Sequence, residues 1–283
     1  MINIAIQKSG RLHEGSLNLL KKCGINLISG KNQLKVKSQD FPLYAYYLRS
    51  NDIPKYVEDG VVDLGIIGSN LIEEKAFNVE IVNHLGFAKC RVSLAIPKSK
   101  KFNSIQDLQG TRIATSYPNT LKKFLKKNGI SAQLHKINGS VEISPNIGLS
   151  DAIFDIVSSG NTLYMNNLKE VVTILKSEAV LIKSPELPDE KKQLVEKLNF
   201  RIQTVLLANR YRYILFNVPN EKIEQVSSLL PVLKSPTVLP LLKKGWSSLH
   251  SVIDEVDFWD VIYKLKEAGA EDILISPIEK MVR

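Results

Sequence analysis

The chain has 283 residues, a formal net charge of +9 and a hydrophobic content of 44%. This length predicts two or three domains, and the hydrophobic content excludes a chain that is disordered throughout. No apolar run is long enough to span a membrane, and residues 1–15 lack the basic start and long apolar centre of a signal peptide. The two cysteines, Cys23 and Cys90, are too few for a disulfide framework or a zinc site. We therefore expect a cytoplasmic protein with reduced thiols and no membrane partner.

The positive charge is unevenly distributed along the chain. Residues 1–204 carry 28 Lys and Arg against 19 Asp and Glu, whereas residues 205–283 carry ten of each. The first part is therefore expected to attract anions, such as phosphate groups on small molecules or on nucleic acid. The alternative is a solvated lysine-rich surface, because pairs such as Lys21–Lys22 and Lys122–Lys123 lie on amphipathic helical patterns. Basic stripes with interleaved aromatic residues do not stand out, so we expect no nucleic-acid partner.

Short apolar runs alternate with helical patterns over the first two-thirds of the chain. In chain order, the patterns predict a strand over 2–6, helices over 12–23 and 53–59, a strand over 63–67, and a helix beginning at Gly68-Ser69. They then predict strands over 90–96 and 112–115, a helix over 120–128, strands over 133–137 and 152–157, and a helix over 163–171. Such alternation predicts an α/β protein with mostly parallel sheets covered by helices.

The number of strands is too large for one small sheet and indicates two lobes. The polar, lysine-rich segment 97–104 is a candidate crossing between them, and a second crossing is expected near 176–184. We assign 1–88 with the return segment 178–208 to lobe I and 89–177 to lobe II, and expect a long helix over 189–209. Ligands of open α/β sheets bind beyond the carboxyl ends of strands, so the loops after Ile6, Ile67, Thr115, Ile137 and Val157 are candidate sites.

The last part of the chain, 209–283, has a pattern of its own. It predicts a strand over 211–217, a helix over 220–230, strands over 237–241 and 249–253, a helix over 256–268 and a strand over 273–276. This βαββαβ order is that of a ferredoxin-like domain, a fold that by itself assigns no function.

The most informative segment follows the predicted strand over 152–157. Six residues lead into a helix: Ser158, Ser159, Gly160, Asn161, Thr162 and Leu163. At such a junction backbone N–H groups and hydroxyls converge, and the helix dipole favours an anion, so the segment suits one phosphate monoester. Asp155, near the strand end, is placed to accept hydrogen bonds from sugar hydroxyls. The alternative is an ordinary turn capped by Ser and Thr, and the segment lacks the lysine of a Walker loop.

Two further segments follow predicted strands. Lys8 and Arg11 lie around Gly10 after the first strand, where they form either a phosphate clamp or a solvated loop. Tyr117 follows the strand over 112–115, where it either stacks on a purine or is a half-buried loop residue. The four histidines are scattered and indicate neither a catalytic triad nor a metal cluster.

Taken together, these segments form part of a long, interrupted signature that extends over essentially the whole chain. Its residues are Glu142, Gly148, Ser150, Ile153, Asp155, Ser159-Gly160 and Thr162-Leu163. The same resemblance continues through the runs IAIQKSGRL, DGVVDLGIIG, RIATSYPNTLKKFL, INGSVE, SPTVLPL and SPIEKM. In these features the chain resembles the ATP phosphoribosyltransferase family, which catalyses the first step of histidine biosynthesis. The tail from about residue 209 resembles the regulatory domain of that family's long form.

This resemblance implies a two-lobed periplasmic-binding-protein-like catalytic part and a C-terminal ferredoxin-like regulatory domain. It implies that ATP and 5-phosphoribosyl diphosphate (PRPP) are joined with Mg2+ as cofactor, that the chain forms dimers and hexamers, and that histidine inhibits it. The catalytic candidates are Asp155, Lys8 and Arg11: Asp155 would hold the ribose hydroxyls, and Lys8 and Arg11 would meet phosphates or the nucleotide. Residues 158–163 would bind the 5-phosphate. The remaining candidates are Tyr117 near the adenine, Arg49 and Glu142 in the pocket, and Thr237 as an effector contact.

The same residues leave some roles unassigned. Phe154 precedes Asp155, whereas many nucleotide-salvage phosphoribosyltransferases carry two adjacent acids there. A second contact to the ribose or metal, and the metal ligands as a set, therefore stay open. A two-lobed solute-binding protein without chemistry is the alternative function, but it predicts an export signal and leaves the C-terminal domain unexplained.

Overall fold

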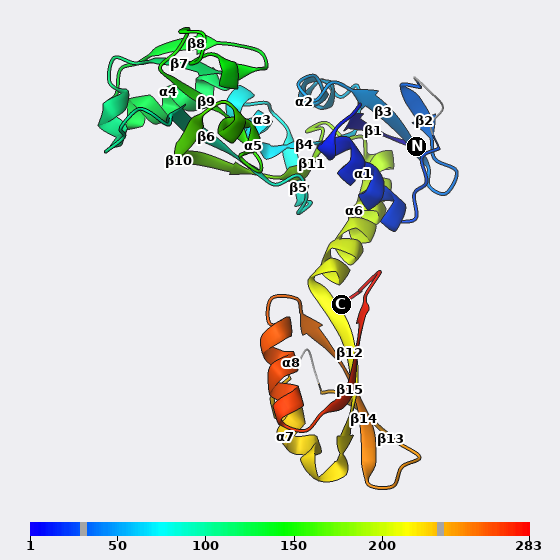
Figure 1. The fold of residues 1–283 in the computed structure, drawn as a ribbon. Coiled ribbons are helices and arrows are strands. Elements are labelled where there is room, and N and C mark those ends of the chain that lie inside the picture. The colour runs from blue at the N-terminus through cyan, green and yellow to red at the C-terminus, as the bar shows by residue number, and fades with distance from the viewer. Residues whose placement is uncertain (29–32, 231–234) are drawn as a thin grey trace. The chain divides into compact units, whose positions relative to one another are not determined.

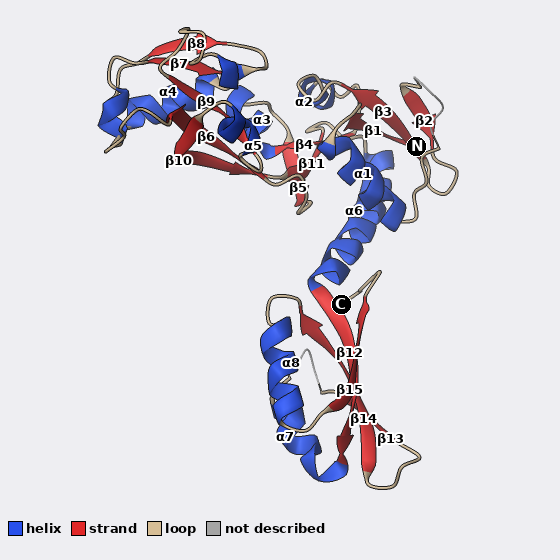
Figure 2. Cartoon of the chain, viewed as in Figure 1, coloured by secondary structure: helices blue, strands red, loops and turns tan. Residues whose placement is uncertain are grey.

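The structure is a computed structural model that describes residues 1–28, 33–230 and 235–283. The chain forms two compact units, Met1–Glu196 and Lys197–Arg283, each containing both helices and strands (Figures 1 and 2). Among the described helices, none combines the length and the apolar character needed to cross a membrane. The boundary between the units falls inside α6 (Asp189–Arg210), whereas the sequence pattern placed it after residue 208.

The first unit contains two sheets, and the sheet that includes the N-terminal strand defines what we call the first lobe. Its strand order is β2-β3-β1-β4-β11-β5. The strands are β1 (Ile2–Gln7), β2 (Lys35–Lys37), β3 (Leu43–Leu48), β4 (Leu64–Gly68), β5 (Glu80–His84) and β11 (Ala179–Lys183). The helices of this lobe are α1 (Arg11–Lys22), α2 (Ile53–Glu58) and α3 (Ser69–Lys75). β1 runs parallel to β3 and β4, so the ends of these three strands meet at one edge of the sheet.

The second sheet defines the second lobe, with strand order β10-β6-β9-β7-β8. Its strands are β6 (Cys90–Pro97), β7 (Arg112–Thr115), β8 (Gln133–Lys136), β9 (Ala152–Val157) and β10 (Leu168–Ser177). Its helices are α4 (Pro118–Lys127) and α5 (Asn161–Met165), with short 3-10 turns at η1 (Ile105–Leu108) and η2 (Val141–Ile143). β7 runs parallel to β8 and β9, so the loops that follow these strands share one edge.

Fully buried aliphatic side chains stabilise both lobes. In the first lobe, β4 and β11 bury apolar side chains on both faces, as at Ile66, Ile67 and Leu181, and helices of the lobe contact both strands. In the second lobe, Leu121 of α4 packs in one cluster with Phe154 of β9. Burying such a side chain stabilises a fold by about 1.5–3 kcal/mol, so the cores hold the strand ends rigidly under the loops.

Three expectations about the first unit are wrong. The predicted helix over 163–171 ends at Met165, and the β-branched run after it belongs to β10, which pairs with β6. The sheets are mixed rather than mostly parallel, because β6 pairs antiparallel with both β9 and β10. The segment 97–104 follows β6 within the second lobe, and the chain crosses from the first lobe between β5 and β6. The return crossing, between β10 and β11, lies within the predicted 176–184.

The second unit is a four-stranded antiparallel sheet with order β13-β14-β12-β15. Its elements are β12 (Tyr211–Pro219), η3 (Asn220–Lys222), α7 (Ile223–Ser228), β13 (Thr237–Pro240), β14 (Trp246–Asp254), α8 (Phe258–Glu267) and β15 (Glu271–Pro277). The two helices lie on one face of the sheet (Figure 2), where Phe216, Val226 and Leu265 form its core. The predicted βαββαβ ferredoxin-like order is confirmed.

Candidate functional site

Residues 158–163, which we call the 158–163 loop, comprise the left-handed turn after β9 and the first residues of α5. Gly160 has φ +84° and ψ −3°, a conformation that residues with a Cβ adopt only with strain. This turn lets the chain reverse within Ser158, Ser159 and Gly160 and start α5 at Asn161. The hydroxyls of the loop and the first N–H groups of the helix therefore lie at the carboxyl end of β9.

A cavity of about 280 Å³ opens beside this loop and collects most of the predicted residues. Its lining consists of Arg11, Glu142, Ile153, Asp155, Ile156, Val157, Ser158, Ser159, Gly160, Thr162 and Leu163. Arg11, on α1 of the first lobe, donates a hydrogen bond from its guanidinium to the hydroxyl of Ser158. The cavity thus combines groups from both lobes, and it holds one cation together with hydroxyl donors. That chemistry suits a phosphorylated ligand.

Two carboxyl groups face the same cavity. Burial and the like charge of Glu142 raise the pKa of Asp155 to about 6. Hydrogen bonds from the N–H of Ile156 and the hydroxyl of Ser116 act in the opposite direction and are the weaker influence. Ionised Asp155 is therefore destabilised in the free protein, and hydroxyl groups or a cation supplied by a ligand would stabilise it.

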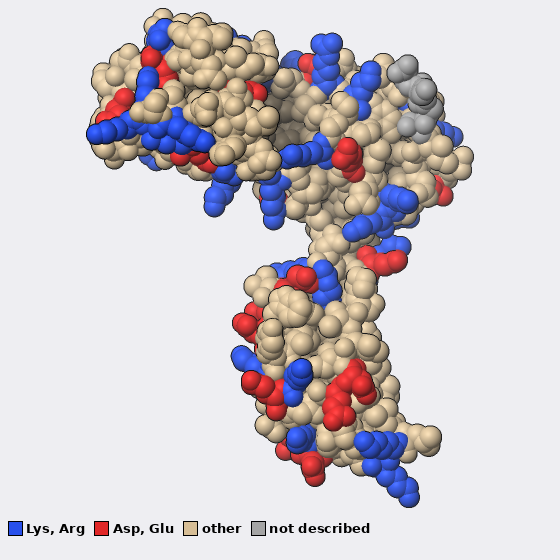
Figure 3. Space-filling view, viewed as in Figure 1, with Lys and Arg blue, Asp and Glu red and all other residues tan. Residues whose placement is uncertain are grey.

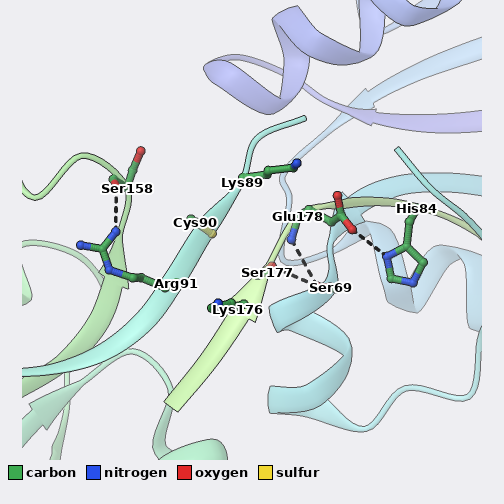
Figure 4. A pocket seen from close by; sticks show the side chains of 9 residues that line it. All are labelled: Ser69, His84, Lys89, Cys90, Arg91, Ser158, Lys176, Ser177 and Glu178. Atoms are coloured by element: carbon green, nitrogen blue, oxygen red, sulfur yellow. Dashed lines mark hydrogen bonds and ion pairs between the residues drawn. The ribbon is translucent and has the colours of Figure 1, made fainter. Parts of the chain in front are cut away.

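A second cavity of about 500 Å³ adjoins the loop at Ser158 and lies where the chain crosses between the lobes (Figure 4). It is lined by Ser69, His84, Lys89, Cys90, Arg91, Ser158, Lys176, Ser177 and Glu178. Sequence reasoning missed its three cations, Lys89, Arg91 and Lys176. The only local signal was their place beside two strand ends, and their approach to Ser158 depends on the pairing of β6 with β9 and β10.

Arg91 links three parts of the second lobe. Its Nε and Nη2 donate to the two carboxylate oxygens of Glu170 at 2.6 and 2.5 Å. Its Nη1 donates to the backbone carbonyl of Ser158 at 3.1 Å, as the dashed line in Figure 4 marks. This two-point ion pair lowers the pKa of Glu170 to about 2. Arg91 therefore holds the start of the 158–163 loop against β6 and β10.

Lys8 and Arg49 lie together at the carboxyl edge of the first sheet. The register of β1 and β3 places Gln7 opposite Leu48, and the N–H of Lys8 donates to the carbonyl of Leu48 at 2.9 Å. Both side chains are exposed, and neither lines the 280 Å³ cavity. The structure thus brings Arg11 to the loop and leaves Lys8 and Arg49 on the facing edge.

Tyr117 lies at the start of α4 and is 7% exposed. Its hydroxyl accepts a hydrogen bond from Asn70 of the first lobe at 2.9 Å, and its ring packs edge-on against Phe154. Burial, together with the charge of Asp155, raises the pKa of Tyr117 above its ordinary value. The residue also lines a third cavity, of about 1030 Å³, between α3 and the loops after β7 and β8.

The chain matches the family model described as ATP phosphoribosyltransferase over residues 49–204, and the model of the C-terminal domain of that family over 208–280. The ATP phosphoribosyltransferase of Cytophaga hutchinsonii is 53% identical over 283 residues, covering 100% of this chain and 99% of the relative. That of Bacteroides thetaiotaomicron is 50% identical, with 100% of both chains covered. The chain belongs to the ATP phosphoribosyltransferase family. It is an enzyme of the phosphoribosyltransferase class, and the reaction of this family is the first step of histidine biosynthesis.

Solved structures agree with this assignment. A chain of the ATP phosphoribosyltransferase HisG:HisZ complex of Thermotoga maritima has a TM-score of 0.63 and 29% identity, covering 73% of this chain and 98% of that chain. A substrate-binding protein of an amino acid ABC transporter has a TM-score of 0.50 and 14% identity, covering 73% of this chain and 93% of that chain, a likeness of fold alone. The periplasmic-binding-protein-like fold is thus confirmed.

Basic side chains are unevenly distributed over the visible face of this phosphoribosyltransferase. In Figure 3, one group of Lys and Arg side chains lies together on the second lobe, and elsewhere Lys and Arg are interspersed with Asp, Glu and uncharged residues. Among the described cations, Arg11 lines the 280 Å³ cavity, and Lys89, Arg91 and Lys176 line the 500 Å³ cavity.

Thr237, the predicted effector contact, begins the exposed edge strand β13. It pairs with His250 of β14, whose Nδ1 lies 2.5 Å from the hydroxyl of Tyr213 on β12. Ser248 places its hydroxyl 3.3 Å from Nε2 of the same histidine. Thr237 thus lies beside polar groups of the sheet, and its role stays a prediction.

Proposed function

We propose that this enzyme joins N1 of the adenine of ATP to C1 of PRPP, releasing pyrophosphate and forming phosphoribosyl-ATP. The observation that carries the proposal is the 280 Å³ cavity, in which Arg11, Asp155 and the 158–163 loop converge. In this proposal the loop binds the 5-phosphate through its hydroxyls and N–H groups, and Asp155 accepts hydrogen bonds from the ribose hydroxyls. We further propose 1–88 with 178–208 and 89–177 as the two catalytic lobes.

The chemistry that these residues need to perform is mainly positioning and charge stabilisation. Displacement at C1 passes through an oxocarbenium-like state while negative charge develops on the leaving diphosphate. Lys89 and Lys176, in the cavity next to the loop, are placed to attract that charge. The N1 atom of adenine carries a free electron pair, so the attack requires no strong general base. Glu142 is therefore proposed to hold ligand groups rather than to remove a proton.

The residues of the cavity fit Mg2+ as the cofactor. The described residues contain no group of three or more His, Cys, Asp or Glu that would form a complete protein cage. Mg2+ usually takes one or two carboxylates together with phosphate oxygens of a substrate, and Asp155 and Glu142 supply two mutually repelling carboxylates. When bound there, the ion would neutralise phosphate charge.

We also propose that the second unit regulates the first. It has a sheet and a core of its own, and its residues from 205 onward carry no net charge. Histidine, bound near Thr237, would inhibit the enzyme by favouring one state of an assembly of dimers and hexamers. A ligand shifts such an equilibrium only if its affinities for the two states differ.

The test is an assay of the purified full chain with ATP, PRPP and Mg2+, following the absorbance of phosphoribosyl-ATP. Pyrophosphatase is included because removing a product draws the reaction forward. Formation of phosphoribosyl-ATP that depends on both substrates is the expected result. Absence of product, with both substrates shown to bind by calorimetry, would overturn the proposed chemistry and leave a binding protein. Histidine is then added to the active enzyme, and unchanged activity at saturating histidine would overturn the regulatory role.

A further inference from the structure

Helix α4 of the second lobe begins without a cap from its own chain segment. Its N-cap residue is Tyr117, whose side chain makes no capping hydrogen bond, and its first residue, Pro118, has no N–H. The next two N–H groups, those of Asn119 and Thr120, are the ones that a capping side chain ordinarily satisfies. Their acceptor must therefore come from elsewhere in the fold.

Glu74, on α3 of the first lobe, supplies that acceptor. Its Oε1 accepts from the N–H of Asn119 at 3.0 Å, and its Oε2 accepts from both the N–H and the hydroxyl of Thr120 at 2.8 Å. The side-chain amide of Asn119 donates to the backbone carbonyl of Glu74 at 3.0 Å. Glu74 is only 6% exposed, and its carboxylate lies at the positive end of the α4 dipole. A buried carboxylate with such a set of donors is held in one geometry.

The other end of α3 is also bonded to the second lobe. Asn70 donates from its amide to the hydroxyl of Tyr117 at 2.9 Å. It accepts at its Oδ1 from the hydroxyl of Ser177, the last residue of β10, and its N–H donates to the same hydroxyl at 3.0 Å. The two ends of α3 are therefore bonded to β10, to Tyr117 and to the start of α4. Helix α3 of the first lobe is thus hydrogen-bonded to the second lobe near both of its ends.

We propose that Glu74 is a positioning residue of the phosphoribosyltransferase reaction. By capping α4 from the opposite lobe it fixes Tyr117, and the cavity that Tyr117 lines, relative to the cationic edge at Lys8, Arg11 and Arg49. The inference rests on the proposed function and on the expectation, implied by the family resemblance, that the ATP adenine lies near Tyr117. Loss of the cap would then weaken ATP binding more than PRPP binding, because the 158–163 loop has contacts that do not involve Glu74: Arg91 holds it from within the second lobe, and Arg11 bonds to Ser158 directly.

The test compares Glu74→Ala and Glu74→Gln with Glu74→Asp, which keeps both carboxylate oxygens, and with Glu73→Gln as the control. Glu73 is exposed on the same helix, so its substitution removes one charge without removing the cap. Hydrogen exchange of the peptide containing Asn119 and Thr120 reports the cap directly, because Glu74 is the acceptor of both N–H groups. Steady-state kinetics of the full chain give separate KM values for ATP and PRPP and a common kcat.

In Glu74→Ala and Glu74→Gln we expect exchange at residues 119–120 to accelerate about tenfold, as loss of a cap predicts. We expect the ATP KM to rise about five- to tenfold, with the PRPP KM within about twofold of the wild type. Glu74→Asp should show smaller increases in the exchange rate and in the ATP KM, and Glu73→Gln should leave both at their wild-type values. A wild-type ATP KM in Glu74→Ala and Glu74→Gln, despite faster exchange, overturns the positioning role. A wild-type chain that forms no phosphoribosyl-ATP overturns the proposed function instead.

Discussion

Replacing Glu170 with Gln tests whether the 158–163 loop is held by the Arg91 ion pair. Arg91 meets both carboxylate oxygens of Glu170 at 2.6 and 2.5 Å, and its remaining nitrogen donates to the carbonyl of Ser158. An amide offers one acceptor oxygen and presents N–H groups to the guanidinium in place of the second. Glu170→Gln therefore breaks the two-point pair and frees Arg91 to rotate away from Ser158.

The size of the effect follows from the pKa of Glu170, which the fold lowers from 4.5 to about 2. The bond to Arg91 is the largest cause, and the hydroxyls of Ser93 and Thr173 add to it. A difference of this size corresponds to about 3 kcal/mol without screening. The Arg91 and Glu170 side chains are 35% and 24% exposed, so solvent reduces the contribution to about 1–2 kcal/mol. We expect Glu170→Gln to destabilise the first unit by that amount at pH 7.

The pH dependence has a definite sign. A carboxyl whose pKa is lowered by folding contributes stability that is present above its ordinary pKa of 4.5 and is lost as the pH falls toward about 2. The difference in urea midpoint between wild type and Glu170→Gln should therefore be constant from pH 7 to 5. It should fall by about half near pH 3. Glu196→Gln, at an exposed position, is the control and should change neither the urea midpoint nor its dependence on pH.

The same variant has a kinetic consequence, because the loop is the proposed PRPP site. We expect the PRPP KM to rise about three- to tenfold while the ATP KM stays within about twofold, the reverse of the Glu74 variants. A stability difference that persists unchanged to pH 3 would refute the ion-pair origin. A wild-type PRPP KM would refute the claim that Arg91 positions the loop.

Three further predictions address the cavity and the second unit. Asp155→Asn should lower kcat/KM by about 2–4 kcal/mol of transition-state stabilisation. It should also raise the melting temperature at pH 7.5, because the fold disfavours the ionised form of Asp155, whose pKa is raised to about 6. Wild-type activity would contradict the first expectation, and a lower melting temperature would contradict the second. In Gly160→Ala the added Cβ meets open space, but the alanine must adopt φ +84°. Gly129→Ala, at φ +68° and also with open space, is the matched control, and both variants should lose about 1–2 kcal/mol of stability. Calorimetry should show weaker PRPP binding in Gly160→Ala alone, and equal affinities would mean that the loop is an ordinary turn. A chain that ends after Arg210 lacks all four strands of the second unit and should lose histidine inhibition in the phosphoribosyl-ATP assay. A truncated enzyme that is active and still inhibited by histidine would place the sensor in the first unit.

The parts of the fold and site that could be predicted are those that local chemistry decides. The 158–163 loop was predictable because its hydroxyls, its glycine and its flanking strand are contiguous in the sequence. The ferredoxin-like unit was predictable because its helical and strand periods are separated by clear turns. The end of the helix predicted over 163–171 was not predictable, because Val171 and its neighbours fit both a helical and a strand pattern. Their pairing with β6, which is distant in the sequence, makes them a strand.

The contacts that position the loop and the lobes were beyond local reasoning. Glu74 is 45 residues from Asn119, and Arg91 is 79 residues from Glu170. In the sequence each is an ordinary charged residue in a chain with many of them. Packing between the lobes gives Glu74 its partner, and the pairing of β6 with β10 gives Arg91 its partner. The sequence pattern predicts that this helix begins at residue 120, whereas the structure begins it at Pro118, so the missing acceptor for Asn119 was not visible in the sequence.

The distribution of charge over the two lobes explains why such distant contacts matter for this reaction. The second lobe carries the loop and the carboxylates of Asp155 and Glu142, whereas Arg11, Lys8 and Arg49 belong to the first lobe. Lys89, Arg91 and Lys176 also lie beside the loop, but Arg11 comes from the first lobe, so in the proposed function the binding of the anionic substrates depends in part on how the lobes are held. Substitutions at the contacts between lobes, such as Glu74, should therefore change substrate affinity more than stability. Substitutions within the buried cores, such as Phe154, should do the opposite.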